Sequence, residues 1–137
     1  MTKNLKVIDN KLLASVIKDA KEHPRLRMNY NIHENLEDNV QQLLNALEPG
    51  TDLPIHRHKS TSETYIILKG SLIVKFYDNN KKMTSSLELK CQSENIGVNI
   101  PANQWHTIEV LESGTVIFEV KEGPYKPNDR NDIMILD

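Results

Sequence analysis

Apolar and polar residues alternate with two different periods in the first quarter of the chain. Over residues 10–22 the apolar positions recur with the spacing of one face of an α-helix, and Pro24 ends this pattern. Asp9 or Asn10 would cap the helix. Over residues 26–32 every second residue is apolar, which predicts a β-strand. The opposite face of this strand carries polar residues: Arg25, Arg27, Asn29, Asn31 and His33.

Residues 40–48 fit two patterns equally well. Helical spacing is found for Val40, Leu43, Leu44 and Leu47. The alternation of a strand is found for Gln42, Leu44, Ala46 and Glu48. A turn signal at Pro49 and Gly50 closes the segment in either case. The hydrophobic pattern alone therefore leaves a helix and a strand open here.

From Gly50 onward the chain consists of short runs rich in β-branched and aromatic residues, with turn signals between them. The runs are residues 63–78 (divided at Gly70 and Ser71), 83–90, 96–101 and 106–123 (divided at Ser113 and Gly114). Several short strands without intervening helices predict an all-β barrel or sandwich, so we expect residues 50–121 to be mostly strand. The expected core includes Leu68, Leu72, Val74, Phe76, Ile100, Ile108, Val116 and Phe118.

Composition and charge are those of one ordinary globular domain. The chain has 137 residues, a net charge of −2, and 38% hydrophobic and 26% charged residues. This balance offers no basic surface for nucleic acid or for an anionic membrane. No apolar run approaches the roughly 18–20 residues that span a bilayer. The first residues lack the pattern of a secretory signal, so the cytoplasm is the default location. The single Cys91 cannot form an internal disulfide, and we expect it to be unreactive.

Residues 56–63 read HRHKSTSE and contain a possible metal-binding pattern. Side chains two residues apart on a strand point the same way, so His56 and His58 would share a face, about 7 Å apart at their Cα atoms. Two imidazoles at that separation can bind one metal ion, with Glu63 as a third ligand. Two surface histidines in a solvated basic turn with Arg57 and Lys59 would give the same pattern. The local pattern leaves both interpretations open.

A longer pattern surrounds this segment. Residues 50–70 read GTDLPIHRHKSTSETYIILKG and resemble the first motif of the cupin superfamily, G-x5-H-x-H-x4-E-x6-G, at every fixed position. Its two glycines would permit tight turns at the ends of strands. The second cupin motif, G-x5-P-x-G-x2-H-x3-N, is similar to residues 95–110, where Pro101 and His106 stand in their places. The chain departs from that motif at Asn95, Asn103 and Val110. An asparagine can take the left-handed conformation of a glycine, which makes Asn103 a mild departure.

The cupin resemblance implies an all-β fold, the double-stranded β-helix or jelly-roll barrel, with a short N-terminal helix. We expect a single domain over residues 1–137, with a helix and strand extension at 1–35, the barrel at 36–122 and a tail at 123–137, whose apolar end would return to pack. The resemblance also implies one divalent metal ion, Zn, Fe, Mn or Ni, bound by His56, His58, Glu63 and His106. Glu63 is expected on the strand adjacent to the two histidines, and His106 on the far side of the barrel. Some cupins keep the barrel without the metal, and their histidines hydrogen-bond one another instead.

A closer resemblance covers nearly the whole chain. Residues 29–51, 56–70 and 100–127 are similar to the WbuC-type cupin metalloproteins, small bacterial proteins encoded among genes for O-antigen or capsule biosynthesis. This resemblance favours a strand for residues 41–50. It also implies that an N-terminal polar cluster and a C-terminal loop approach the pocket: Arg27, Asn29, Asn31, His33, Pro124 and Tyr125.

The favoured hypothesis is a metal-dependent enzyme that acts on a sugar or sugar nucleotide, as an isomerase or epimerase of surface-polysaccharide (lipopolysaccharide) biosynthesis. The alternatives are a non-catalytic saccharide-binding or sensor module and an Fe(II)-dependent oxygenase. In the enzyme, His33 or Tyr125 would donate or accept the proton that enolisation needs. The residues expected to line the pocket are Arg25, Arg27, Asn29, Asn31, Lys59 and Gln104, of which Arg25, Arg27 and Lys59 would hold an anionic substituent. We also expect a homodimer that forms through a strand edge or a swapped N-terminal strand, as barrel cupins commonly do.

Overall fold

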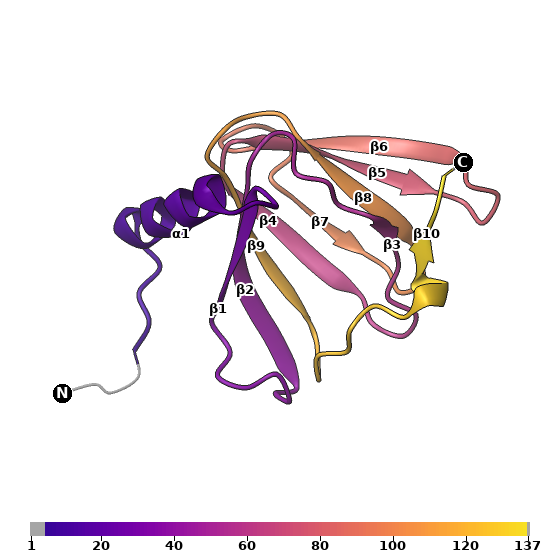
Figure 1. Cartoon of the computed structure of the whole chain (residues 1–137), viewed down its shortest axis with the longest axis horizontal. Coiled ribbons are helices and arrows are strands. Elements are labelled where there is room, and N and C mark those ends of the chain that lie inside the picture. The colour runs from indigo at the N-terminus through magenta and orange to yellow at the C-terminus, as the bar shows by residue number, and fades with distance from the viewer. Residues whose placement is uncertain (1–4, 137) are drawn as a thin grey trace.

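A computed structural model describes residues 5–136 of the chain, which form two sheets and one α-helix. The elements are α1 (Asn10–Glu22), β1 (Arg27–Asn31), β2 (Val40–Leu47), β3 (Ile55–His56), β4 (Glu63–Lys69), β5 (Ser71–Tyr77), β6 (Met83–Lys90), β7 (Gly97–Ile100), β8 (Trp105–Val110), β9 (Thr115–Glu122), the 3-10 helix η1 (Arg130–Asp132) and β10 (Ile133–Met134). The expected all-β fold with a short N-terminal helix is confirmed (Figure 1). No helix within residues 5–136 combines the length and the apolar character needed to cross a membrane.

Each sheet has five strands, and neighbouring strands are antiparallel. The strand orders are β1-β2-β9-β4-β7 in one sheet and β10-β3-β8-β5-β6 in the other. Most neighbours in these orders are distant in sequence, as a jelly roll requires. The chain therefore alternates between the two sheets, and residues from distant motifs meet in the space between them.

Three hydrophobic clusters hold the elements together. Of the two that contain predicted core residues, the larger cluster lies between the sheets, and the smaller one lies between α1 and the outer face of the β1-β2-β9-β4-β7 sheet. The third consists of Ile55, Trp105 and Met134, from β3, β8 and β10. Of the predicted core residues, the larger cluster contains Leu72, Val74, Phe76, Ile100 and Ile108. The smaller cluster contains Leu68, Val116 and Phe118. The predicted residues are thus buried or packed against buried neighbours, although they belong to two cores rather than to one.

Strand β2 shows why residues 40–48 fit two patterns. Its Leu44 and Ala46 pack beneath α1, whereas Leu47 on the opposite face packs between the sheets. Because both faces are covered, apolar residues occupy consecutive positions and imitate the stripe of a helix. The strand that the family resemblance favours is confirmed over Val40–Leu47.

Helix α1 covers the outer face of β1 and β2, on the side of the molecule away from β10 (Figure 1). Its N-cap is Asp9, whose carboxylate accepts a hydrogen bond from the backbone N–H of Leu12 at 2.9 Å. Leu13, Val16 and Ala20 form its buried face. The helix thereby protects the apolar outer face of the sheet from water and leaves the space between the sheets free for other residues.

Tight turns occur where the cupin motifs have glycine. Gly50 and Gly70 have φ values of +92° and +79°, in the region that only glycine adopts readily. Asn103, which replaces a motif glycine, has φ +70° and its backbone N–H donates to the carbonyl oxygen of His58 at 2.7 Å. The second motif is therefore joined directly to the first through this turn.

The C-terminal segment returns to the barrel. Strand β10 pairs with β3, with Ile133 opposite His56, and the carbonyl of Asp132 accepts from the backbone N–H of Arg57 at 3.0 Å. Arg57 and Asp132 also form an ion pair of 3.1 Å. The tail thus fixes the backbone of the segment that carries the first two histidines.

Candidate metal centre

Four predicted ligands come together at one end of the space between the sheets. His56 ends β3 and pairs directly with His106 of the neighbouring strand β8. Glu63 begins β4, a strand of the opposite sheet. His58 lies in the loop between β3 and β4, where the chain passes from one sheet to the other. The two strand histidines therefore approach from one sheet, and the carboxylate approaches from the other.

This arrangement differs from the sequence expectation in three ways. The strand with His56 ends there and does not include His58, because the chain turns towards β4 after its bonds to the C-terminal segment. Glu63 is not on the strand adjacent to His56 but across the barrel. His106 is not on the far side, since it is the cross-strand partner of His56. Strand order depends on long-range pairing, which the local spacing of the motif does not encode.

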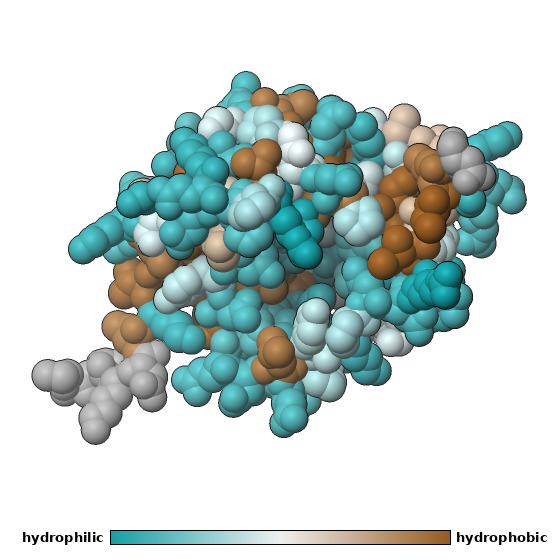
Figure 2. Space-filling view, in the orientation of Figure 1, coloured by the Kyte–Doolittle hydropathy of each residue, from teal (hydrophilic) through white to brown (hydrophobic). Residues whose placement is uncertain are grey.

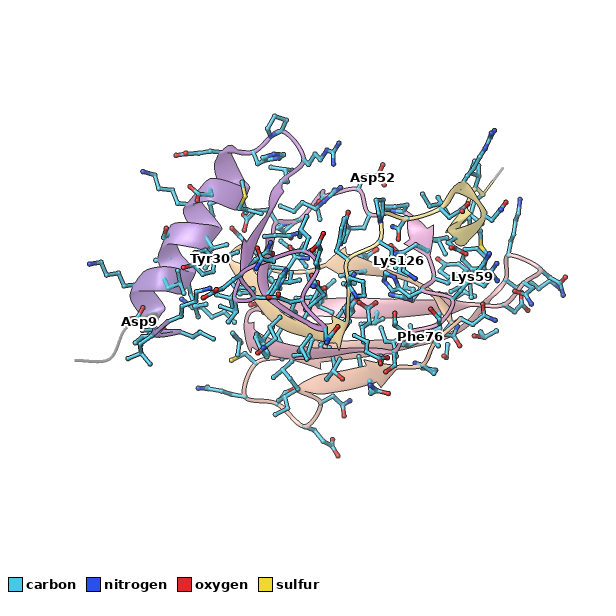
Figure 3. All side chains as sticks on the ribbon, turned by 90° about the horizontal axis from the view of Figure 1, so that it is seen from below. Asp9, Tyr30, Asp52, Lys59, Phe76 and Lys126 are labelled. Carbon is cyan, nitrogen blue, oxygen red and sulfur yellow. The ribbon has the colours of Figure 1, made fainter. Side chains whose placement is uncertain are left out.

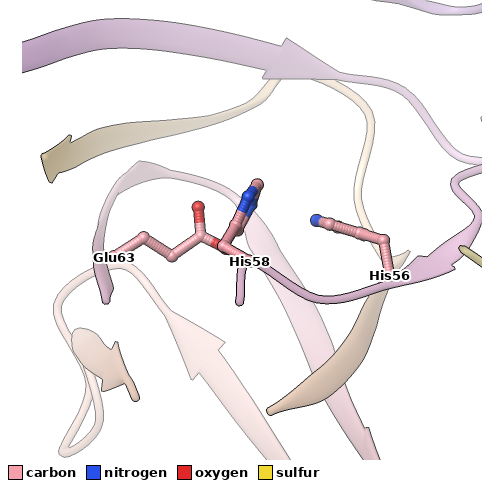
Figure 4. A group of neighbouring side chains, drawn as sticks. All are labelled: His56, His58 and Glu63. Atoms are coloured by element: carbon pink, nitrogen blue, oxygen red, sulfur yellow. The ribbon is translucent and has the colours of Figure 1, made fainter. Parts of the chain in front are cut away.

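The donor atoms are close enough to share one ion. One ligand atom from each of His56, His58 and Glu63 lies within 4.8 Å of the others, and the three side chains converge in Figure 4. The ring centroids of His56 and His58 are 5.2 Å apart, and those of His56 and His106 are 4.4 Å apart. This cluster of imidazoles and one carboxylate could bind a divalent metal ion.

His106 joins the cluster through the carboxylate. Its Nε2 lies 2.7 Å from Oε1 of Glu63, and both side chains are nearly fully buried. The hydroxyl of Tyr65 donates to the same oxygen at 2.9 Å and lies 3.3 Å from His106 Nε2. His58 Nε2 is 3.6 Å from that oxygen. Glu63 is thus the common partner of the groups at the centre.

Hydrogen bonds to backbone carbonyls orient two of the imidazoles as metal ligands. Nδ1 of His56 donates to the carbonyl of Pro54 at 3.0 Å, and Nδ1 of His106 donates to that of Gln104 at 2.9 Å. With Nδ1 protonated, Nε2 is the nitrogen that presents a lone pair, as in most protein metal sites. A proton or a cation must then lie between His106 Nε2 and Glu63, because two acceptors would otherwise repel each other at 2.7 Å. The donor set therefore fits a metal ion.

Burial sets the ionisation of the cluster. It lowers the pKa of His56 to about 4, with a further contribution from His106. It also lowers the pKa of His58 against the attraction of Glu63. Burial opposes the ionisation of Glu63, but the hydrogen bond from His106 and the surrounding imidazoles outweigh it and lower the pKa of this carboxyl. At neutral pH, His56 and His58 are thus neutral and Glu63 is ionised, as metal binding requires.

A cavity of about 260 Å³ opens beside these ligands. Hydrophilic side chains surround a hollow at the centre of the face seen in Figure 2. His56, His58 and Glu63 lie in the cavity wall, so the centre faces a space that could admit a small molecule. Of the residues predicted to surround the centre, those that line the cavity are Arg27, Asn29 and Tyr125.

The other predicted residues lie elsewhere in the structure. Nδ1 of His33 lies beside the backbone of Gln42, and the amide of Gln104 donates to the carbonyls of Tyr77 and Trp105. Lys59 lies 3.7 Å from Asp132 on the wall of a neighbouring groove. Arg25 and Asn31 are exposed. These five residues do not line the cavity, and their roles in binding or catalysis stay predictions.

Four residues that line the cavity were not predicted from the sequence. They are Asn45, Tyr65, Glu119 and Lys121, all of which line the cavity. Asn45 Nδ2 donates to Oε1 of Glu119 at 2.9 Å. Burial and the charge of Glu63 raise the pKa of Glu119 to about 7. A signal was present for Tyr65, because it stands two residues after Glu63 and therefore shares its face of the strand. For the residues of β9, the partner strand would have had to be known.

The family of the chain follows from its sequence. Residues 8–89, more than half of the chain, match the family model described as "Domain of unknown function (DUF6016)". The chain belongs to this family. A search of curated proteins found no relative.

Solved structures with a similar fold include cupins. TT1209 from Thermus thermophilus has a TM-score of 0.60 at 19% identity, with 86% of this chain and 97% of that chain covered. A cupin-2 domain containing protein from Shewanella frigidimarina has a TM-score of 0.54 at 21% identity, with 70% and 80% covered. Oxalate decarboxylase from Bacillus subtilis, described with Mn(II) centres, has a TM-score of 0.56 at 21% identity, with 80% of this chain and 28% of that chain covered. At these identities the likeness shows the cupin fold.

Proposed function

We propose that the chain is a metal-dependent cupin enzyme that moves a proton next to a carbonyl group of a small, oxygen-rich molecule. The observation that supports this most is the position of the ligand set at the wall of a cavity rather than inside a closed core. Structural metal sites are usually closed by protein ligands, whereas catalytic sites keep a position open for substrate. The opening towards a polar cavity therefore favours chemistry over a structural ion.

His56, His58, Glu63 and His106 would hold the ion in this proposal. A bound divalent ion supplies a Lewis acid that polarises a carbonyl oxygen and makes the neighbouring C–H bond more acidic. The hydrogen bonds of His56 and His106 to backbone carbonyls keep the ligating nitrogens oriented. The hydroxyl of Tyr65 holds the carboxylate of Glu63 from within the barrel, so that it remains aimed at the imidazoles.

Glu119 is the group best placed to transfer the proton. It lies in the cavity wall, and Asn45 holds its Oε1, while no other described residue hydrogen-bonds its carboxylate. A pKa of about 7 suits a general base at neutral pH. Glu119 would take the proton from the carbon next to the carbonyl and return it to the other face or to the adjacent carbon. Epimerisation results in the first case and isomerisation in the second. The phenol of Tyr125, which also lines the cavity, could deliver a proton to an oxygen.

The substrate class in this proposal is a sugar or a sugar derivative from surface-polysaccharide biosynthesis. The resemblance to WbuC-type proteins supports the pathway. The cavity supports the chemistry, because the amides of Asn29 and Asn45 can hydrogen-bond hydroxyl groups and the guanidinium of Arg27 can pair with a negative substituent. A cavity of about 260 Å³ suits a molecule no larger than a single sugar unit.

Hydrogen exchange tests the proposal directly. Metal-loaded protein is offered a panel of nucleotide sugars and simple aldoses and ketoses in deuterated water, and deuterium is measured at the carbon next to the carbonyl. We expect incorporation with the wild-type chain and a rate at least about 100-fold lower with Glu119→Gln. Glu88→Gln, on the exposed face of the edge strand β6, is the matched control and should exchange like the wild type.

Three outcomes would contradict the proposal. Saturable binding of a sugar without exchange or product would favour a binding module. Consumption of oxygen by the Fe(II)-loaded chain with an oxidised product would favour an oxygenase. Equal exchange by wild type and Glu119→Gln would remove the proton-transfer role of Glu119.

A homodimer also stays a prediction. Light scattering that shows only a 15.7 kDa species would contradict it.

A further inference from the structure

A second hollow adjoins the cavity at the metal centre. It is a groove of about 560 Å³ between the loop at residues 57–61 and the C-terminal segment at residues 121–132. Figure 3 shows two of its lysines, Lys59 and Lys126, away from α1. The groove and the cavity share four lining residues: His58, Lys121, Lys126 and Asn128. Since these residues border both spaces, a ligand at the metal centre could extend into the groove.

Two cations of the groove share one carboxylate. Arg57 Nε lies 3.1 Å from Oδ1 of Asp132, and Lys59 Nζ lies 3.7 Å from the same oxygen. The guanidinium of Arg57 also lies over the ring of Trp105, 4.4 Å from its centroid. Asp132 can neutralise only one of the two positive charges. This wall of the groove therefore keeps an excess of positive charge.

The two lysines at the junction add further positive charge. Within residues 5–136, no carboxylate forms an ion pair with Lys121 or Lys126. Lys121 stands opposite Glu63 in the pairing of β9 with β4, on the inward face of the strand. Its Nζ lies 5.8 Å from the centroid of the Tyr125 ring, at the boundary between the two spaces. The carboxylates of Glu63 and Glu119 share the inward face with Lys121, but neither forms an ion pair with it. Both ammonium groups therefore keep donors for a ligand that passes from the cavity into the groove.

The remaining acidic residues of the groove, Glu122 and Asp129, cancel this charge only in part. Glu122 follows Lys121 on β9, so its side chain points to the opposite face of the strand. The side chain of Asp129 accepts a hydrogen bond from the backbone N–H of Asn131 at 2.9 Å, which caps η1. The lining therefore holds four cations (Arg57, Lys59, Lys121 and Lys126) and three carboxylates (Glu122, Asp129 and Asp132), so the groove presents more positive than negative charge to a ligand.

One buried polar atom in the cavity wall has no hydrogen-bond partner among residues 5–136. Oδ1 of Asn45 is buried without a hydrogen bond, although Nδ2 of the same amide is bonded to Glu119. A buried acceptor without a donor destabilises the fold, so such atoms usually meet a ligand or water. A hydroxyl group of a ligand in the cavity would supply the donor. The cavity can therefore bind hydroxyl groups, and the positive charge of the groove favours an anion.

We propose that the cavity and the groove form one binding site for a phosphorylated small molecule, with its hydroxyl-bearing part in the cavity and its phosphoryl group at Lys121 and Lys126. A phosphoryl group fits better than a carboxylate for two reasons. It carries more charge and more acceptor oxygens, which matches two unpaired ammonium groups and the hydroxyls of Ser60 and Thr61. The groove is also about twice as large as the cavity, so it can hold a diphosphate or a nucleotide.

This inference names the substrate class of the proposed function and rests on it only for the part of the ligand at the metal centre. The anion site itself depends on Lys121 and Lys126. It can therefore be tested without metal and without turnover.

Calorimetric titration of the full chain with inorganic pyrophosphate, after removal of metal with EDTA, tests the anion site. We expect saturable binding that weakens at least about tenfold in the double variant Lys121→Ala, Lys126→Ala, because two charge-assisted contacts are lost. The control is Lys82→Ala, Lys90→Ala, which removes the same charge near the ends of β6, the far edge of the other sheet. It should bind pyrophosphate like the wild type. Malonate, a dicarboxylate, should bind at least about tenfold more weakly than pyrophosphate.

Each other result overturns the inference. Absence of pyrophosphate binding, or equal weakening in the control, would show that there is no anion site or only a general effect of net charge. Equal affinity for malonate would reject the assignment to phosphoryl groups. If the double variant fails to fold, Lys126→Ala alone, at an exposed position, must still weaken binding. Deuterium exchange on unphosphorylated sugars would leave the proposed enzyme intact while this site failed, so the two failures are distinguishable.

Discussion

The two ends of the barrel interior share the same strand pairing but differ in their inward-facing side chains, which are polar at one end and apolar at the other. Along β4 and β9 the inward-facing pairs change from Glu63 with Lys121 at one end, through Tyr65 with Glu119, to Ile67 with Ile117 at the other. In the facing sheet, His106 is followed by the inward positions Ile108 and Val110 on β8, which pair with Val74 and Leu72.

The inward residues of one end stabilise the fold, whereas those of the other end could bind a metal ion and a small molecule. At the apolar end the side chains are packed and nearly inaccessible, so burial of hydrocarbon stabilises the fold. At the polar end the same inward positions hold ligands, an acid and a lysine around a cavity. Because hydrophobic burial at one end holds the strands in place, the other end can tolerate buried charges that would not stabilise a fold by themselves. Variants at the two ends should therefore have separable effects.

The largest expected effect is on stability at the apolar end. Leu72 is fully buried between the sheets, and Leu72→Ala should lower the free energy of unfolding by about 2–5 kcal/mol. Urea denaturation of metal-free protein measures this change. The variant should still bind metal in the amount that the wild type does, as long as it is folded. A folded Leu72→Ala chain without metal binding would show that the two ends are not independent.

The second effect is on metal binding at the polar end. His106→Gln keeps a hydrogen-bond donor beside Glu63 but removes the imidazole ligand. We expect metal affinity to fall by about 100-fold or more, measured by competition with a chelating dye, whereas the free energy of unfolding without metal changes by less than about 1 kcal/mol. Unchanged metal affinity would mean that His106 is not a ligand and only supports the carboxylate.

Several parts of the fold and of the candidate site could be predicted from the sequence, because they depend on local patterns. The helix over residues 10–22, the strands after Gly50 and the turn at Asn103 follow from periodicity and backbone preference. The ligand set follows from motif spacing. The other residues of the cavity wall could not be predicted from motif spacing. Glu119 and Lys121 reach the centre only because β9 pairs with β4, and the two strands are separated by more than forty residues in sequence. Likewise, His33 has the right chemistry for the centre, but its backbone pairing directs it to Gln42.

A third, smaller effect concerns pH. Burial raises the pKa of Glu119 to about 7, so between pH 5 and 7 the folded chain holds a proton there that the unfolded chain has released. Stability from this group is therefore lost as pH rises towards and through 7. Glu119→Gln removes the effect, so its free energy of unfolding relative to the wild type should be higher at pH 7.5 than at pH 5. Urea denaturation at the two pH values measures it, and a difference of the opposite sign would contradict the assignment.

The lowered pKa values of His56, His58 and Glu63 act in the opposite direction. Their contributions to stability are present at neutral pH and are lost as pH falls, between about 6.5 and 4 for His56 and below the ordinary carboxyl range for Glu63. The comparison between wild type and Glu119→Gln cancels these contributions, since both chains contain the three ligands.

The smallest effect is expected in the turn that joins the two motifs. Asn103 has φ +70°, which glycine adopts without strain but a β-branched residue does not. Asn103→Gly should change the free energy of unfolding by less than about 1 kcal/mol and keep metal binding. Asn103→Val should lose more stability than Asn103→Gly, measured in the same denaturation experiment. Equal effects of the two substitutions would show that backbone conformation does not limit this position.

The contrast between the two ends requires one metal ion at the polar end of the barrel. Anomalous X-ray scattering from crystals of the metal-loaded chain, recorded at the absorption edge of the bound metal, tests it most directly. We predict one peak per chain, about 2.0–2.2 Å from imidazole nitrogens of His56, His58 and His106 and in contact with the carboxylate of Glu63. No peak at this position under saturating metal, with His106 still hydrogen-bonded to Glu63 as in the metal-free arrangement, would show that these four residues do not form a metal site.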